Sequence, residues 1–247
     1  MQGAARFAGL LILALALALA LAPGAVRASP VSAPLIIAAR NGQLSDVLAD
    51  LAQGQNPNVT DPYGYTPTMW AISRGGLQIL QALLSHGAKL PAATADYVPI
   101  IAAAKSGKAD VVQFLLQQGA AVDARDSSGN TALIWAAQRG NAEVVSTLVA
   151  AGADVNAANN RGQTPLILAA QLGETDLINL LASQKADLNA RDQFGYTALI
   201  WAAHNGFSAA AKALVAAGAD ASIAGKDGLT AKAVAQRRGY AGLAQSL

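Results

Sequence analysis

A motif centred on threonine recurs along this chain at a nearly constant spacing. Aligned on the Thr of GNTALIWAAQRGN (residues 129–141), the equivalent positions lie 33 residues apart in five steps and 32 in one: Ala33, Thr66, Val98, Thr131, Thr164, Thr197 and Thr230. A glycine follows nine residues after each of them, from Gly42 to Gly239. A period of this length indicates an array of small units, each of which buries its apolar face only by stacking on its neighbours.

The chemistry within one period predicts two short helices. Threonine is a preferred N-cap residue, and Pro67 and Pro165 follow it at the first helical position. The glycine nine residues later can adopt the left-handed conformation that ends a helix. A second apolar stripe at helical spacing follows, as in Val144, Val145 and Leu148. Each unit should therefore be a helix–turn–helix.

These motifs resemble the ankyrin repeat family over essentially all of residues 30–247. The resemblance rests on DPYGYTPTMWAISRGG, DSSGNTALIWAAQRGN, NNRGQTPLILAAQLGE and DQFGYTALIWAAHNGF, followed by stretches such as VVSTLVAAGADVN. It implies an all-α solenoid of about seven stacked units joined by β-hairpin fingers, with the terminal units acting as caps. The repeat domain would span 29–247, in approximate units 29–60, 61–92, 93–125, 126–158, 159–191, 192–224 and 225–247.

The first 28 residues have the pattern of a secretory signal peptide. Arg6 precedes an unbroken apolar run from Ala8 to Ala22, and small residues at Val26 and Ala28 form a cleavage site. The alternative is a membrane anchor, but a spanning helix needs about 20 apolar residues. We expect cleavage after Ala28, a periplasmic or secreted location, and no stable membrane insertion afterwards.

Charge and cysteine content exclude several classes of function. The chain has 17 Lys and Arg against 15 Asp and Glu, but Arg6 and Arg27 lie in the expected leader, which leaves 15 of each. A neutral mature protein gives no support to nucleic-acid binding. With no cysteine, the chain has no disulfide, thiol nucleophile or Cys-based zinc site.

No catalytic or metal-binding motif is evident, so we expect a protein that is not an enzyme and holds no cofactor or metal. The two histidines, His86 and His204, lie in different repeats and at different repeat positions. Asp154, Asp187 and Asp220 recur 33 residues apart. They could suggest a calcium ladder, although hydrogen bonding within the loops is the favoured interpretation.

In the ankyrin family, partners usually lie in the concave groove, which the fingers and the ends of the first helices line. Five of the seven first-helix ends here carry a fixed positive charge and a sixth carries histidine, whereas none carries an acid. The candidates are Arg74, Lys105, Arg139, His204 and Arg237. They favour a partner with an acidic surface, but cations also stabilise helix C-termini, and the two interpretations stay open.

Aromatic side chains are the second sign of a binding face. The expected fingers carry Tyr63, Tyr65, Tyr97, Phe194 and Tyr196. Exposed aromatics are typical of binding hot spots, and packing between adjacent fingers is the alternative. Three tryptophans share one repeat position, for which packing is favoured over an aromatic ligand channel: Trp70, Trp135 and Trp201.

Two departures from the repeat remain. The third unit lacks the finger glycine and the threonine and is one residue short, and Lys185 replaces a turn glycine. The first departure is a tailored contact loop or simple drift. The second requires a different or strained turn.

The function predicted from the sequence is an exported, monomeric scaffold that binds an unknown protein through its concave face. Narrower alternatives are an inhibitor, immunity protein or stabilising partner of a secreted or periplasmic enzyme. Two alternatives belong to other classes of function: a protein that binds a small molecule or metal in its groove, and a structural protein of the cell envelope.

Overall fold

The computed structural model describes residues 33–247, which form one compact unit. The expected signal peptide, residues 1–28, lies outside the described residues. The described part contains fourteen helices in seven pairs, which we number as units 1–7: α2 (Pro34–Asn41) and α3 (Leu44–Ala52), α4 (Pro67–Arg74) and α5 (Leu77–Ser85), α6 (Pro99–Ser106) and α7 (Ala109–Gln117), α8 (Ala132–Gln138) and α9 (Ala142–Ala150), α10 (Pro165–Leu172) and α11 (Thr175–Ser183), α12 (Ala198–Asn205) and α13 (Ser208–Ala217), α14 (Ala231–Arg237) and α15 (Ala241–Ser246).

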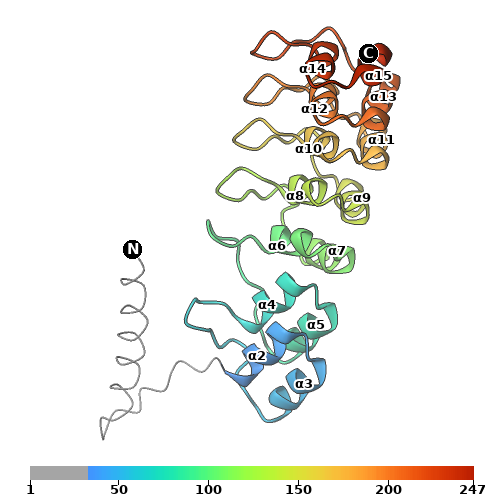
Figure 1. Ribbon diagram of the computed structural model, residues 1–247. Helices are drawn as coiled ribbons and strands as arrows, with labels where there is room; N and C mark the ends of the chain where they lie inside the picture. Colours follow the sequence, from blue (N-terminus) through green and yellow to red (C-terminus); the bar gives the residue numbers. More distant parts are fainter. Residues whose placement is uncertain (1–32) are drawn as a thin grey trace, which may run out of the picture. The chain divides into compact units, whose positions relative to one another are not determined.

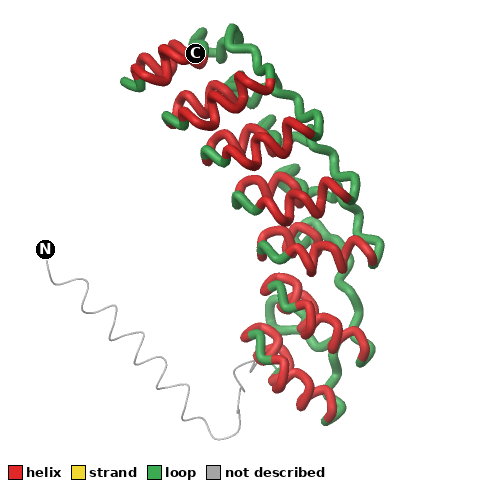
Figure 2. Tube along the Cα trace, turned by 90° about the vertical axis from the view of Figure 1, so that its right-hand side faces the viewer, coloured by secondary structure: helices red, strands yellow, loops and turns green. Residues whose placement is uncertain are grey.

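The pairs stack in chain order, so that each first helix contacts the first helix of the next unit (Figure 1). The second helices form a parallel layer behind them, and the connecting loops project from the other side of the first helices. Seen from the side, the stack of residues 33–247 is curved (Figure 2). The predicted all-α ankyrin-type solenoid is confirmed.

The threonines begin the first helices as predicted. Thr131 Oγ1 accepts a hydrogen bond from the backbone N–H of Ile134 at 3.3 Å, which satisfies one of the unpaired donors at a helix start. Thr66, Thr164, Thr197 and Thr230 do the same in their units. Val98 has no side-chain acceptor, and the first helix of unit 3 begins without this cap.

Small and apolar residues hold neighbouring units together. Ala136 and Ala137 are fully buried, and a side chain without bulk lets the adjacent first helix approach closely. Val144, Val145 and Leu148 of α9 are also fully buried. Removing such apolar surface from water contributes about 25 cal/mol per Å², so every unit depends on its neighbours for stability.

The fingers are narrow loops instead of the expected β-hairpins. Among residues 33–247 no strand is present, and the only β-type pairing is an isolated bridge between Ala224 and Thr230. The finger of unit 4 is closed by the N–H of Asp126, which donates to the carbonyl of Asn130 at 3.0 Å. The Asp126 carboxylate accepts the N–H groups of Ser128 and Asn130, both at 2.9 Å, so a side chain satisfies donors that a ladder would use.

Lys185 takes the strained turn expected from the sequence. Its φ is 63°, whereas glycines at the equivalent turns, such as Gly119 and Gly152, have φ of 86° and 85°. A left-handed conformation costs a residue with a Cβ about 1–2 kcal/mol. In the part of the chain that is described, no helix has the length and apolar content needed to cross a membrane.

Candidate protein-binding face

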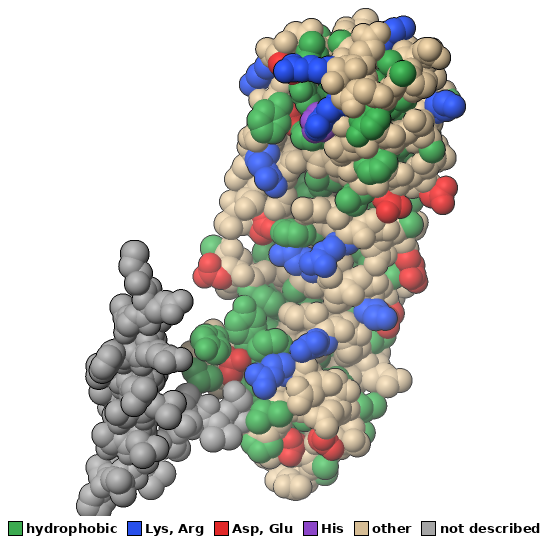
Figure 3. Space-filling model, in the orientation of Figure 1, with side chains coloured by type: hydrophobic (Ala, Val, Ile, Leu, Met, Phe, Trp, Pro, Cys, Tyr) green, Lys and Arg blue, Asp and Glu red, His purple; other side chains and the backbone are tan. Residues whose placement is uncertain are grey.

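The side of the array formed by the fingers and the first helices carries most of the predicted site residues; we call it the finger face. Figure 3 shows it with Lys and Arg side chains recurring up its middle and acidic side chains beside the fingers. A hydrogen bond between a tryptophan and an aspartate of the same unit recurs in three units of this face. Trp135 Nε1 donates to Asp126 Oδ2 at 2.8 Å. The equivalent pairs are Trp70 with Asp61 at 3.2 Å and Trp201 with Asp192 at 2.8 Å.

The sequence contains a signal for these pairs that we did not predict. All three tryptophans have an aspartate nine residues earlier. At the equivalent positions unit 3, whose finger is one residue short, combines Thr94 with Ala102, and units 5 and 7 combine Asn159 with Leu168 and Gly225 with Val234. Aspartate therefore occurs where an indole N–H needs an acceptor. The tryptophans are half-buried against the core, as the packing interpretation predicted, and their N–H groups are satisfied within their own fingers.

The Asp126 carboxylate is held in its charged form. Burial on its own would raise the pKa of Asp126, but hydrogen bonds from Trp135 Nε1, Asn130 and Ser128 lower it below the usual 3.8. Asn130 donates twice, from its backbone N–H and from Nδ2. The Asp126 carboxylate therefore closes the finger and holds the indole of Trp135 in place.

Cations from the preceding unit cover two of the three indoles. Lys105 Nζ lies 3.8 Å from the ring centroid of Trp135, and Arg40 Cζ lies 5.8 Å from that of Trp70. Burial lowers the pKa of Lys105, Arg139 lowers it further, and Asp126 opposes both. A cation–π contact contributes about 0.5–2 kcal/mol, so these cations help to join neighbouring units as well as charging the surface.

Four of the predicted residues meet in one hollow of about 380 Å³ in units 2–4: Tyr65, Tyr97, Lys105 and Arg139. Ile101 and Ala102 of α6 also line it, and Asp96 and Asp126 lie on its finger side. Its two cations stand on or just after the ends of α6 and α8. The hollow is therefore polarised, with carboxylates near the fingers and cations near the helix ends.

Tyr97 differs from the expected exposed anchor. Only 9% of its surface is exposed. Its hydroxyl donates to the backbone carbonyl of Met69 at 3.2 Å, and its ring meets that of Tyr65 edge-on at 6.2 Å. Burial raises the pKa of Tyr97 well above its usual 10.0. Tyr97 therefore forms a wall of the hollow and is no exposed anchor.

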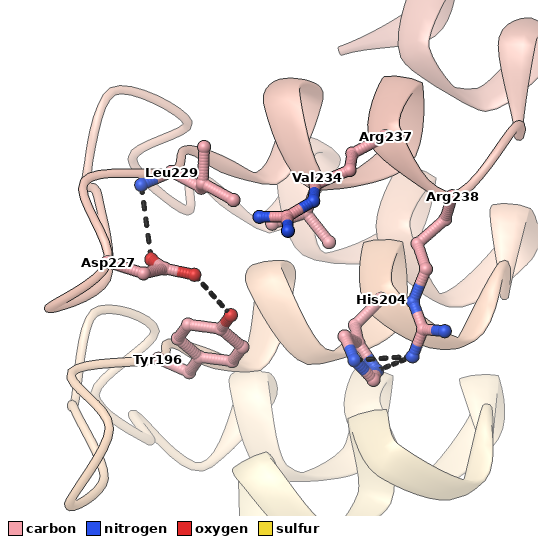
Figure 4. A pocket seen from close by; sticks show the side chains of 7 residues that line it. All are labelled: Tyr196, His204, Asp227, Leu229, Val234, Arg237 and Arg238. Carbon is pink, nitrogen blue, oxygen red and sulfur yellow. Dashed lines mark hydrogen bonds between the residues drawn. The ribbon is translucent and has the colours of Figure 1, made fainter.

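A second hollow, of about 310 Å³, lies between units 6 and 7 and contains Tyr196, His204 and Arg237 (Figure 4). The Tyr196 hydroxyl donates to Asp227 Oδ2 at 2.7 Å. This bond raises the pKa of Tyr196 and lowers that of Asp227. The guanidinium of Arg238 donates to the ring of His204. His204 is thus engaged with a side chain of the next unit, beyond the contact with its own helix end that its position suggested.

The remaining candidates lie outside these hollows. Tyr63 is 85% exposed, and Phe194 is 53% exposed, with its ring 6.4 Å from those of Tyr196 and Trp201. Arg74 borders a different depression, beside Leu44 and Asp110. The predicted residues therefore form two separate hollows and several isolated positions, without one continuous site.

The recurrent aspartates are engaged in loop hydrogen bonds. Asp154 Oδ1 accepts the N–H of Asn156, and Asn156 Oδ1 accepts the N–H of Asp187 in the next unit, at 2.9 and 2.7 Å. Across residues 33–247, no group of three or more His, Asp or Glu side chains has the arrangement of a metal site. The loop-bonding interpretation accounts for these carboxylates.

Comparison with known proteins finds a family model described as ankyrin repeats (3 copies), which matches residues 35–126, 100–192, 152–225 and 176–247. Human cyclin-dependent kinase inhibitor 2A is 33% identical over 97 residues, 38% of this chain and 62% of that protein. A Caenorhabditis elegans homolog of transient receptor potential cation channel subfamily A member 1 is 29% identical over 98 residues, 40% of this chain and 8% of that protein. An E3 ubiquitin-protein ligase from the same organism is 34% identical over 111 residues, 43% of this chain and 4% of that protein. The matched segments thus cover less than two thirds of each relative.

Proposed function

Because the chain belongs to the ankyrin-repeat family, whose repeats are a general scaffold for protein–protein interaction, we propose that it binds another protein through its finger face. Ankyrin-repeat proteins are typically scaffolds without enzymatic activity. The proposed mechanism is rigid recognition: a preformed surface loses little conformational freedom on binding.

One observation carries the proposal most directly. Aromatic rings and helix-end cations occur together on the finger face, as in the hollow that holds Tyr65, Lys105 and Arg139. Tyr and Arg are enriched among the residues that contribute most to interface affinity, and a positive helix-end side favours an acidic partner surface. The partner we propose is therefore a protein that presents carboxylates to this face.

A narrower possibility is that binding inhibits the partner. The specific observation in its favour is the similarity to a protein named a cyclin-dependent kinase inhibitor. Inhibition of a secreted or periplasmic enzyme, or stabilisation of one, would fit the same surface. Activity of the captured partner, measured with and without this chain, separates inhibition from stabilisation.

The test of the binding face uses two matched variants. The face variant combines Tyr63→Ala, Lys105→Glu and Arg139→Glu, and the control combines Gln113→Ala, Lys185→Glu and Lys212→Glu, which are exposed positions of the second helices and their turns. Each is used as bait in a cell-envelope extract, and captured proteins are compared by mass spectrometry. We expect a specific protein that the wild type and the control capture and the face variant loses. Equal capture by all three baits would refute the assignment.

We also propose that the chain is exported, on the pattern of residues 1–28. Reporter fusions after Ala28 and after Ser45 test it, with a second pair in which residues 8–22 are deleted. We expect export of the first pair and cytoplasmic retention of the second. Retention of both pairs would contradict the proposal.

A further inference from the structure

Unit 3 is the place where the finger face lacks a large side chain. The position occupied by tryptophan in units 2, 4 and 6 varies in size along the chain: Ile37, Trp70, Ala102, Trp135, Leu168, Trp201 and Val234. Ala102 is the smallest of these, and it lies between two units that carry an indole. The hollow of about 380 Å³ opens over Ala102, with Tyr65, Tyr97 and Ile101 as its apolar walls.

The finger of unit 3 is altered together with this helix position. Thr94 stands where the tryptophan-bearing units have aspartate, as the first residue of the hydrogen-bonded finger turn. The N–H of Thr94 donates to the carbonyl of Tyr97 at 2.8 Å, which leaves a turn of two residues where the finger of unit 4 has three. Aspartate and indole are thus absent as a pair, and the shorter finger leaves the space over Ala102 open.

The neighbouring fingers are joined by a hydrogen bond from unit 4 onward. The backbone N–H groups of Asn160, Gln193 and Lys226 each donate to a carbonyl in the preceding finger, at 3.0, 2.8 and 2.9 Å. Within residues 33–247 no equivalent bond joins the finger of unit 3 to that of unit 2 or unit 4. The hollow therefore lies where the row of hydrogen-bonded fingers is interrupted. A segment of a partner protein can enter there without breaking a hydrogen bond between fingers.

The charges around the hollow favour an anion on one side. The Asp126 carboxylate already accepts bonds from Trp135, Asn130 and Ser128. Arg139 and Lys105 lie close enough for Arg139 to lower the pKa of the Lys105 ammonium. A carboxylate placed between these two cations would relieve their repulsion.

We propose that this hollow receives one aromatic side chain of the partner protein, followed by an acidic residue of the partner that pairs with Lys105 and Arg139. The space is that of the indole missing at Ala102, and the acid matches the two cations at the helix ends. This inference rests on the proposed function, since it names the anchor by which the partner would bind. It makes unit 3 a recognition site and explains its departure from the repeat.

The direct probe is a set of three blocked tripeptides: Glu-Phe-Glu, Lys-Phe-Lys and Glu-Ala-Glu. Each is titrated into the ¹⁵N-labelled full chain and followed by amide chemical shifts. We expect Glu-Phe-Glu to bind roughly tenfold more tightly than either control and to shift the amides of α6 and of residues 94–97. Equal affinity for the three peptides, or shifts confined to other units, would overturn the proposal. So would tighter binding of free phenylacetate, because the hollow would then serve a small molecule.

Filling the hollow supplies the matching variant. Thr94→Asp with Ala102→Trp rebuilds the pair of units 2, 4 and 6, and Asn159→Asp with Leu168→Trp makes the same change in unit 5 as the control. Glu-Phe-Glu binding should be lost in the first and retained in the second. Ala102→Leu, which fills the space without a new polar group, should also weaken binding and covers the case in which the first variant does not fold. Unchanged binding in folded Ala102→Leu would contradict the inference.

The two proposals fail separately. A captured protein that the face variant loses but the filled-hollow variant retains would refute this inference and leave the proposed function standing. If no protein is captured in a face-dependent manner, the proposed function fails, whatever the peptides do.

Discussion

Replacing Asp126 by Asn should expose how much the aspartate–tryptophan pair contributes to the fold. The Asn side chain has one acceptor oxygen and one NH₂ donor. If its oxygen stays on the N–H groups of Ser128 and Asn130, its NH₂ faces the indole N–H of Trp135, which is itself a donor. If the amide flips, the two backbone donors lose their acceptor instead. Either arrangement leaves a donor without a partner.

Unit 5 shows how the chain avoids this conflict. Asn159 Oδ1 accepts the N–H groups of Arg161 and Gln163 at 2.9 and 3.0 Å, and the residue nine positions later is Leu168, which has no donor. A double-mutant cycle of Asp126→Asn and Trp135→Leu therefore converts unit 4 into the arrangement of unit 5. It separates the indole bond from the turn bonds, which Asn can keep.

The expected magnitude follows from the loss of one bond to a charged acceptor. Such bonds contribute about 1.5–3 kcal/mol, and partial exposure of Asp126 reduces this towards the lower end. We expect Asp126→Asn to lower the free energy of unfolding by about 1.5 kcal/mol in the wild type and by about 0.5 kcal/mol in the Trp135→Leu background. The coupling energy is then about 1 kcal/mol.

Urea unfolding followed by far-UV circular dichroism measures all four proteins, because the helical backbone supplies most of that signal. The m-value must be the same in the four, since a changed slope would mean that the array no longer unfolds in one step. A coupling energy below about 0.3 kcal/mol, within the range of independent sites, would refute a structural role for the pair.

Three further predictions use the same measurement. Lys185→Gly should raise the free energy of unfolding by about 0.5–1 kcal/mol, because φ of 63° is strained for lysine and free for glycine; no gain would contradict the strain. Gly173→Ala should lower the free energy of unfolding more than Gly42→Ala. Both glycines have φ of 76°, but only the first substitution would place a Cβ 2.7 Å from the Phe207 ring. Equal losses of stability would exclude this steric cause. Hydrogen bonds lower the pKa of Asp126 in the folded state below 3.8, so its contribution to the free energy of unfolding is complete above that pH and is lost as the pH falls through the folded value. Asp126→Asn should therefore reduce the loss of stability on acidification. An unchanged loss would contradict this role of the carboxylate.

The fold was predictable because it depends on features that one sequence displays. A period of 33, a threonine cap and a glycine stop fix the two helices of each unit, since capping and helix termination are local. The strain at Lys185 was predictable for the same reason. The form of the fingers was not, because the Asp126 carboxylate replaces ladder bonds by accepting the same donors.

The candidate face was predicted less completely, because it depends on contacts between units. Residue type placed Tyr97 among the exposed aromatics, yet its side chain is buried and its hydroxyl donates to the carbonyl of Met69 in the preceding unit. The aspartate–tryptophan pairs could have been found by comparing the units with one another. Nothing in a single unit indicates that an indole and an acid nine residues apart share a hydrogen bond.

The helix-end cations also divide by their position in the unit, which changes the meaning of the basic stripe. At the seventh residue after the threonine position, Arg40 and Lys105 each lie over the indole of the next unit, thirty residues later. Before Trp201 the same position holds Gln171, and that indole packs instead against His204 at 5.3 Å. The position of these two cations therefore depends on a contact with an aromatic ring as well as on the helix end that carries them. An acidic side chain of the partner that pairs with Lys105 must compete with the Trp135 ring for this cation. Arg139 is the eighth residue after its threonine, and the next unit has Leu168 in place of an indole. The affinity for the partner's acid should therefore depend mainly on Arg139.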